Sequence, residues 1–314
     1  MVISLYQPYS FSQLGHRTNQ EDCRLPNADA PTDGQFFFAV CDGVGGSDDG
    51  EVASRSVCKG FEDALSDIDW SDPFTVEDFR QALTEAYNCL DRAAEETGNR
   101  DMATTLTFVC FHGDGCLAAH IGDSRIYQIR PQSGIIYRSS DHSQVNSLVH
   151  AGVLSPDQTD SHPDRSVITR YMEPSNEHEP RCMATVLQIR DIQADDYFVL
   201  CTDGVIESVD DRQLVRIVCG DSNDKDKCRQ LASLCRKSQD NNTLYLIHVA
   251  NVETDDEEDE TDKKQAADAV DNMYSEHVTW QSFRHPHTTE DVEADAPSES
   301  LTDSILHFIK NIFH

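Results

Sequence analysis

Basic residues are scarce in this chain of 314 residues. Lys and Arg total 25 against 57 Asp and Glu, which gives a formal net charge of −32. So large an excess of negative charge argues against nucleic-acid binding and against electrostatic attraction to an anionic membrane. From Asn251 onward, 17 acidic and 4 basic residues give a net charge of −13, so the first 250 residues carry −19. The body of the protein is therefore acidic in its own right, and we expect it to be monomeric.

The sequence also lacks long apolar runs and paired cysteine motifs. No stretch approaches the roughly 20 apolar residues that a transmembrane helix needs, and no cationic leader with an apolar stretch opens the chain. The eleven cysteines are odd in number and include no pair spaced C-x-x-C, which disfavours a disulfide framework and a zinc site. Several lie inside apolar runs, as buried free thiols of a reducing compartment do. These absences predict a cytoplasmic protein without a signal peptide.

Three apolar runs that are typical of buried strands end in an aspartate beside a glycine. The runs at residues 36–40, 117–121 and 197–200 lead into Asp42, Asp123 and Asp203, respectively. One Asp-Gly pair after an apolar run is usually no more than a turn. A fourth segment inverts the order, because Asp240 stands just before the apolar run at residues 243–249.

Four such positions in one chain predict a metal site. The start of one antiparallel strand lies beside the end of its neighbour, so the four aspartates could converge on one edge. Carboxylates crowded there would repel one another unless a cation compensated their charge. Oxygen ligands alone suit Mg²⁺ or Mn²⁺ better than Zn²⁺.

The pattern of the remaining segments predicts an α+β fold with antiparallel sheets. Apolar residues recur at helical spacing in residues 51–65 and 76–97, and Gly98 closes the second of these helices. A dense β region follows at residues 102–137, and residues 141–180 form an irregular excursion with a short helix at 144–150. The later predicted elements are strands at 182–189 and 197–200, helices at 210–218 and 225–238, and a last strand at 243–249.

The C-terminal part differs in composition. Residues 251–300 are highly charged and poor in aliphatic side chains, so we expect a disordered acidic linker. In residues 301–314 the apolar side chains share one helical face, which predicts a short amphipathic helix that is too short to span a bilayer. This helix could dock on a partner or on the body of the protein. A disordered tail with an incidental apolar end is an equal alternative.

Clustered carboxylates that hold a pair of divalent metal ions suit hydrolytic transfer at phosphorus. Two ions can activate a water molecule and neutralise charge on the phosphoryl oxygens. An arginine would complete such a site, because its guanidinium forks onto phosphate. Arg17 is the candidate, since it lies four and five residues before Glu21 and Asp22.

The order and spacing of these segments resemble the motifs of the metal-dependent protein phosphatases, the protein phosphatase 2C or PPM family. The resemblance spans about residues 5–250, and the series is far more specific than any one motif. Residues 141–180 resemble the flap subdomain of the bacterial branch. The matching segments are residues 17–22, 40–46, 103–105, 121–125, 202–204 and 240–243.

The resemblance implies a fold, a metal site and roles for the candidate residues. The fold would be a four-layer α-β-β-α sandwich of two antiparallel sheets flanked by helix pairs, within a phosphatase domain at residues 1–250. The site would hold two Mn²⁺ or Mg²⁺ ions, with a possible third. The metal positions would be Asp42, the Gly43 carbonyl, Asp203 and Asp240, with Asp123 for the third ion and Glu207 near it.

The resemblance also implies a mechanism. A metal-bridging hydroxide would attack phosphoserine or phosphothreonine in a phosphoprotein substrate without a covalent phosphoenzyme. Arg17 would bind the phosphate, Glu21 would hold water in the site, and Asp22 would orient the Arg17 loop. Val44 stands where many eukaryotic members carry a histidine proposed as general acid, so the general acid is unassigned.

Two other functions compete with an active serine/threonine phosphatase. One is a catalytically silent scaffold or regulatory binding protein of the same fold; the loss of a metal aspartate would favour it, and none is lost. The other is a phosphatase of a sigma-factor regulator, which a fused sensor domain would favour. Three further residues, His16, His120 and Arg125, are better explained as structural, and Arg125 as part of a salt bridge within the body.

Overall fold

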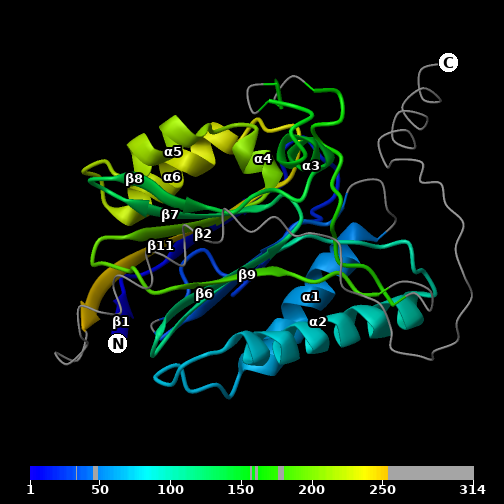
Figure 1. Cartoon of the computed structure of the whole chain (residues 1–314), viewed down its shortest axis with the longest axis horizontal. Coiled ribbons are helices and arrows are strands. Elements are labelled where there is room, and N and C mark those ends of the chain that lie inside the picture. Colours follow the sequence, from blue (N-terminus) through cyan, green and yellow to red (C-terminus); the bar gives the residue numbers. More distant parts are fainter. Residues whose placement is uncertain (33, 45–48, 156–157, 160–161, 176–179, 254–314) are drawn as a thin grey trace, which may run out of the picture. The chain divides into compact units, whose positions relative to one another are not determined.

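The structure is a computed structural model that describes residues 1–32, 34–44, 49–155, 158–159, 162–175 and 180–253. In these residues, helices pack against two antiparallel β-sheets (Figure 1). The α+β fold class expected from the sequence is therefore confirmed. The predicted acidic linker, apart from its first three residues, and the predicted helix at residues 301–314 lie outside the described residues.

The first sheet contains six of the described strands. Its order is β1-β11-β10-β7-β8, and β2 also pairs with β11. The long strand β11 thus contacts β1 and β2 on one side and β10 on the other. The strands are β1 (Val2–Leu5), β2 (Tyr9–Gln13), β7 (Arg125–Arg130), β8 (Gly134–Arg138), β10 (Tyr197–Cys201) and β11 (Asn242–Glu253).

The second sheet has five described strands in the order β3-β4-β5-β6-β9. Every neighbouring pair in it is antiparallel. Cys23 pairs with Cys41 across β3 and β4, and a hydrogen bond of 3.1 Å from Gly43 N to Glu21 O continues this pairing past the strand ends. The strands are β3 (Cys23–Leu25), β4 (Phe37–Cys41), β5 (Leu106–His112), β6 (Gly115–Ile121) and β9 (Thr185–Ile189).

The central strands are apolar throughout because both of their faces are buried. In β4, Ala39 and Cys41 pack with helix residues, whereas Phe38 and Val40 face a second cluster that contains side chains of both sheets. Successive side chains of a strand point to opposite faces. The rings of Phe38 and Tyr245, with centroids 5.2 Å apart, join the two sheets directly. Apolar packing between the sheets therefore fixes how their edges meet.

Each sheet has its own helices (Figure 1). Helices α1 (Gly50–Leu65) and α2 (Val76–Thr97) pack with the second sheet, and α4 (Asp203–Ile206), α5 (Asp211–Val218) and α6 (Asp224–Cys235) pack with the first. Helix α3 (Gln144–His150) lies in the segment at residues 141–180. Among the described helices, none is long and apolar enough to cross a membrane.

Local signals in the sequence explain where the longest helix begins and ends. Thr75 and Asp78 form a reciprocal capping box at the start of α2, and Gly98 ends it with a left-handed φ of 71°. The predicted bounds of α2 and α3 are confirmed. The sequence missed two short elements, β3 and α4, and the β region predicted from residue 102 begins with β5 at Leu106.

Candidate metal centre

The structure brings the four predicted aspartates together at one edge of the two sheets. Asp42 follows β4, Asp123 follows β6, Asp203 begins α4 directly after β10, and Asp240 precedes β11. Burial raises the pKa of Asp42 well above its ordinary value, and the negative charges of the other carboxylates raise it further. The four side chains are therefore close enough to repel one another.

A fifth carboxylate, Asp22, lies opposite Asp42. The pairing of β3 with β4 places residues 22 and 42 across from each other. Burial raises the pKa of Asp22 to about 7. One of its oxygens, Oδ2, accepts a hydrogen bond of 3.0 Å from the Thr202 hydroxyl, whereas Oδ1 is buried without a hydrogen-bond partner among the described residues.

The two remaining buried carboxylates have raised pKa values for similar reasons. Burial, then Asp240 and Glu207, raises the pKa of Asp203 to about 6, and its buried Oδ1 has no hydrogen-bond partner in the described part of the chain. Burial, then Asp203 and Asp141, raises the pKa of Asp123 to about 7. The predicted neighbour Glu207 thus acts on Asp203.

Glycine allows the loops of this edge to approach one another closely. A Cβ atom on Gly43 would lie 2.6 Å from the carbonyl oxygen of Gly50 and 2.8 Å from that of Glu21. A Cβ atom on Gly204 would lie 2.1 Å from the carbonyl oxygen of Asn241. Only glycine permits this contact between backbones, so the glycines that follow Asp42 and Asp203 are part of the construction of the site.

Arg17 reaches the same edge from the loop after β2. Its Nη2 atom donates a hydrogen bond of 2.6 Å to Asp240 Oδ2, and the two side chains are 47% and 30% exposed. This contact raises the pKa of the Arg17 guanidinium. The arginine is therefore at the carboxylate cluster and open to solvent, where a ligand could reach it.

Asn241 holds the Arg17 loop against the Asp240 loop, and sequence analysis missed it. Its Nδ2 atom donates to the carbonyl oxygens of Leu14 and Asn19, and its Oδ1 atom accepts from the backbone N–H of Glu21. The sequence pointed to Asn241 only through its place in the motif segment at residues 240–243, where it directly follows Asp240. An amide is the one side chain of this size that both donates and accepts in this way.

The carboxylate cluster fits hard divalent cations by its chemistry. It offers oxygen donors only, and it leaves two buried carboxylate oxygens unpartnered. Burial and the charges of neighbouring carboxylates raise the pKa values of its members, and a bound cation would offset that charge. Within the described ranges, no three His, Cys, Asp or Glu side chains surround one point as metal ligands, and Asp240 instead contacts Arg17. Ion binding would thus require Asp240 to exchange that partner.

Comparison with known proteins agrees with this geometry. Residues 16–237 match the family model for protein phosphatase 2C. The chain belongs to the protein phosphatase 2C family. It is therefore a metal-dependent serine/threonine protein phosphatase.

Relatives of the phosphatase are bacterial. It is 29% identical over 243 residues to the protein phosphatase PhpP of Streptococcus pneumoniae, covering 74% of this chain and 93% of that protein. The serine/threonine phosphatase Stp1 of Staphylococcus aureus has a similar structure, with a TM-score of 0.67 and 27% identity over 81% of this chain and 98% of that one.

A further solved structure bears on the metal. The catalytic domain of the serine/threonine phosphatase PstP, in complex with two manganese ions, matches with a TM-score of 0.63 and 26% identity. The match covers 80% of the phosphatase and 100% of that domain. Manganese is thus bound by a protein of similar structure, and the residues that would hold metal ions in this chain are considered below.

The residues that the sequence assigned to structural roles have such contacts. The His120 ring is buried and hydrogen-bonds the carbonyl oxygen of Ser140, and His16 bonds Gln239 at the surface. Arg125 forms a two-bond ion pair with Asp141, at 2.7 and 2.6 Å. The expected salt bridge of Arg125 within the body is therefore confirmed.

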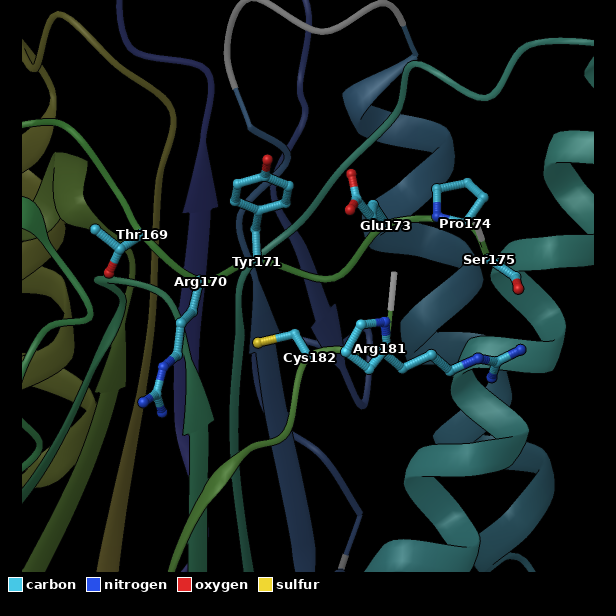
Figure 2. A pocket seen from close by; sticks show the side chains of 9 residues that line it. Thr169, Arg170, Tyr171, Glu173, Pro174, Ser175, Arg181 and Cys182 are labelled. Atoms are coloured by element: carbon cyan, nitrogen blue, oxygen red, sulfur yellow. The ribbon is translucent and has the colours of Figure 1, made fainter. Parts of the chain in front are cut away.

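A cavity of about 190 Å³ lies where the chain leaves the 141–180 segment (Figure 2). Arg170 and Arg181 both contribute to its wall, but their side chains point in different directions. Arg181 is already paired with Asp91 at 2.5 Å. The cavity therefore lacks the converging cations that a second phosphate site would need.

Proposed function

We propose that the phosphatase hydrolyses phosphoserine and phosphothreonine in proteins directly, without a covalent phosphoenzyme. The observation that carries this proposal is the cluster of buried carboxylates with raised pKa values, which lies beside an exposed arginine. No cysteine or serine in the cluster is needed as a nucleophile.

The metal-binding residues are proposed from the same cluster. Asp42, the carbonyl of Gly43, Asp203 and Asp240 would hold two Mn²⁺ or Mg²⁺ ions, and Asp123 a third. When bound, these ions would supply an activated water and offset the charge on the phosphoryl oxygens. The buried Oδ1 atom of Asp203, which has no hydrogen-bond partner among the described residues, supports this assignment.

Arg17 would act on the substrate, Glu21 on solvent, and Asp22 on the loops that surround them. The Arg17 guanidinium has more donors than the one that meets Asp240, so it can receive two phosphate oxygens as a fork. Glu21 borders the cluster, and burial raises its pKa, so it can orient water there. Asp22 fixes Thr202, which in turn accepts from Thr243 N at 3.0 Å and so ties the Asp203 loop to β11.

We also infer the finer organisation of the chain. The phosphatase domain would span residues 1–250 as four α-β-β-α layers, with the flap at residues 141–180. Three apolar clusters among the described residues, one between the sheets and one beneath each group of helices, support this order.

All eleven cysteines lie in the described part and are free, which supports a cytoplasmic location. Phosphoproteins are the proposed partners, and the protein is proposed to be a monomer. A role for residues 301–314 in docking stays a prediction.

The test is hydrolysis of a phosphothreonine peptide and of p-nitrophenyl phosphate by the full chain, with Mn²⁺ or with EDTA. Asp42→Asn and Asp203→Asn each remove a charge that the ions need, so we expect each variant to lose at least about a hundredfold in turnover. Asp67→Asn is the matched control, because Asp67 is exposed and far from the cluster in the chain.

Two outcomes would overturn the proposal. Turnover in EDTA equal to that in Mn²⁺ would remove the metal from the reaction. Folded protein that binds Mn²⁺ but never hydrolyses either substrate would favour the silent scaffold instead.

A further inference from the structure

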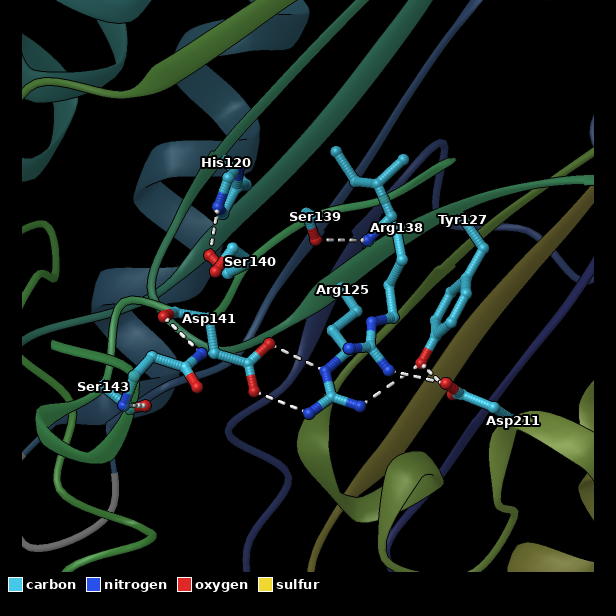
Figure 3. Close-up of polar contacts among 11 residues, drawn as sticks. His120, Arg125, Tyr127, Arg138, Ser139, Ser140, Asp141, Ser143 and Asp211 are labelled. Carbon is cyan, nitrogen blue, oxygen red and sulfur yellow. Dashed lines mark hydrogen bonds and ion pairs between the residues drawn. The ribbon is translucent and has the colours of Figure 1, made fainter. Parts of the chain in front are cut away.

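The start of β7, directly after the turn that carries Asp123, is fastened to the start of the 141–180 segment by polar contacts that include those of Arg125 and Ser139 (Figure 3). The turn comprises residues 122–124, between β6 and β7, and we call residues 139–143 the neck. Ser139 contacts Ile126 through both its backbone N–H and its hydroxyl oxygen, each at 2.9 Å. The start of the neck is therefore bonded to β7 close to the turn.

The strongest contact is the ion pair of Arg125 with Asp141. Arg125 Nε donates to Asp141 Oδ1 at 2.7 Å, and Arg125 Nη2 donates to Oδ2 at 2.6 Å. The side chains are only 20% and 16% exposed. A two-bond arginine–carboxylate pair fixes orientation as well as distance. The third nitrogen, Nη1, lies 3.4 Å from the hydroxyl of Tyr127, so every nitrogen of the Arg125 guanidinium already has a partner within the body.

The next residue, His142, forms hydrogen bonds with the turn through both its backbone and its ring. Its N–H donates to Gly122 O at 2.9 Å, and its Nδ1 atom accepts from Gly122 N at 3.1 Å. The His142 ring also stacks on His120, with centroids 4.4 Å apart. Both backbone groups of the residue before Asp123 are therefore bonded to the neck.

The opposite side of the turn leads to Asp42. Ser124 and Thr105 share a hydrogen bond of 2.8 Å between their hydroxyls, and Thr105 Oγ1 accepts from Asp42 N at 3.1 Å. The later part of the 141–180 segment is also bonded near Asp42. Met172 and Thr104 exchange backbone hydrogen bonds, and the Thr104 hydroxyl donates to Asp42 O. Both ends of this segment are thus bonded to the surroundings of the carboxylate cluster.

We propose that Arg125 and Asp141 are positioning residues, which hold the turn so that the carboxyl group of Asp123 faces the cluster and keeps a fixed relation to the neck. The proposal rests on the proposed function of the cluster. Without the pair, the turn would keep its contact with Thr105 but lose the charged contact that sets its angle. Neither residue would touch the substrate.

The experiment uses the full chain with Asp141→Asn, Arg125→Lys and both together. Asn keeps the shape of Asp141 but loses its charge, and Lys keeps the charge of Arg125 but cannot form two parallel bonds. We expect the Mn²⁺ concentration for half-maximal activity to rise about tenfold in each variant, the size of effect typical of residues that orient metal ligands. We also expect KM for p-nitrophenyl phosphate to change less than twofold.

A second set of variants separates positioning from general stability. If Arg125 and Asp141 act through Asp123, then adding Asp141→Asn to Asp123→Asn has no further effect on the Mn²⁺ requirement. Arg190→Gln is the matched control, because it removes a 2.6 Å ion pair with Asp114, at the opposite end of β6 from the turn. It should leave the Mn²⁺ requirement unchanged. Fully additive effects, or an unchanged requirement in Asp141→Asn, would overturn the proposal.

Hydrogen exchange of the metal-free protein provides a readout that does not depend on activity. In EDTA, Asp141→Asn should speed exchange of the amides at residues 122–124 at least about tenfold, whereas amides in the centre of β6 should not change. Unchanged exchange at the turn would overturn the positioning role even in an active enzyme. If the wild-type protein shows no turnover but Asp141→Asn still speeds exchange at the turn in this way, then only the proposed function is refuted.

Discussion

At the residue scale, the sequence revealed the acidic members of the site but not the groups that hold them. Asp42, Asp123 and Asp203 stand out because an apolar strand ends at each of them, and this pattern can be recognised from the sequence alone. Asn241, Thr202 and Thr105 carry no such mark. They were missed because their roles depend on hydrogen bonds between loops up to about 220 positions apart, as between Asn241 and Glu21, and no local pattern encodes such a contact.

The half-buried His142 should make the stability of the protein sensitive to acid. Burial, then the neighbouring His120 and Arg170, lowers the pKa of His142 to about 3, against about 6.5 in an unfolded chain. The folded state thus favours the neutral ring. Its contribution to stability is full above about pH 6.5 and is lost progressively as the pH falls towards about 3. We expect a smaller fall in the thermal midpoint between pH 7 and pH 5 for His142→Gln than for the wild type, with both proteins in EDTA.

The control for this effect is His150→Gln, at an exposed position of α3. It should follow the wild-type profile. An identical acid-induced fall for His142→Gln and the wild type would show that the ring is not responsible for the loss.

At the element scale, the helices were easier to predict than the sheets. Helix α2 carries its own start and stop signals, so its bounds were correct. The three residues of β3 have no apolar run of their own, and they form a strand because β4 pairs with them. The sequence also does not indicate whether a buried side chain of a strand packs against a helix or against the other sheet, since both surroundings are apolar.

The contact between α1 and α2 depends on Gly60. A Cβ atom there would lie 2.4 Å from the Cα atom of Ala86 and 2.8 Å from its backbone nitrogen. Alanine usually favours a helix over glycine by about 1 kcal/mol, but here α2 would have to move. We expect Gly60→Ala to lower the free energy of unfolding by about 1–3 kcal/mol, as measured by urea denaturation.

Glu62→Ala, on the exposed side of the same helix, should change the free energy of unfolding by no more than about 0.5 kcal/mol. A stabilised Gly60→Ala protein would mean that the two helices can separate without cost, and that the close packing is not needed.

At the scale of the whole molecule, the net charge of −32 was evident from composition alone. Its consequence is kinetic, because a strongly acidic protein repels acidic ligands and attracts basic ones at a distance. The substrate itself carries a negative phosphate, so the residues around that phosphate should decide the sign of the long-range force.

We expect ionic strength to affect basic and acidic phosphopeptides in opposite directions. Between about 0.01 M and about 0.1 M salt the Debye length falls from about 30 Å to about 10 Å. KM for a phosphothreonine peptide flanked by lysines should therefore rise, and KM for one flanked by glutamates should fall. Steady-state kinetics at fixed Mn²⁺ measures both.

The small substrate p-nitrophenyl phosphate is the internal control for this experiment, since it has no flanking charges. If all three substrates respond to salt alike, then the effect lies in the metal or in the enzyme itself and not in long-range attraction.

If Arg17 binds the phosphate as proposed, its contact with Asp240 also determines when the enzyme can first work. These residues are 223 positions apart, and Asp240 lies just before β11, which joins β10 to β1 and β2. A ribosome must therefore synthesise almost the whole described domain before Arg17 meets its partner. On this proposal, nascent or prematurely terminated chains that end before residue 240 lack the site and cannot dephosphorylate proteins in the cell.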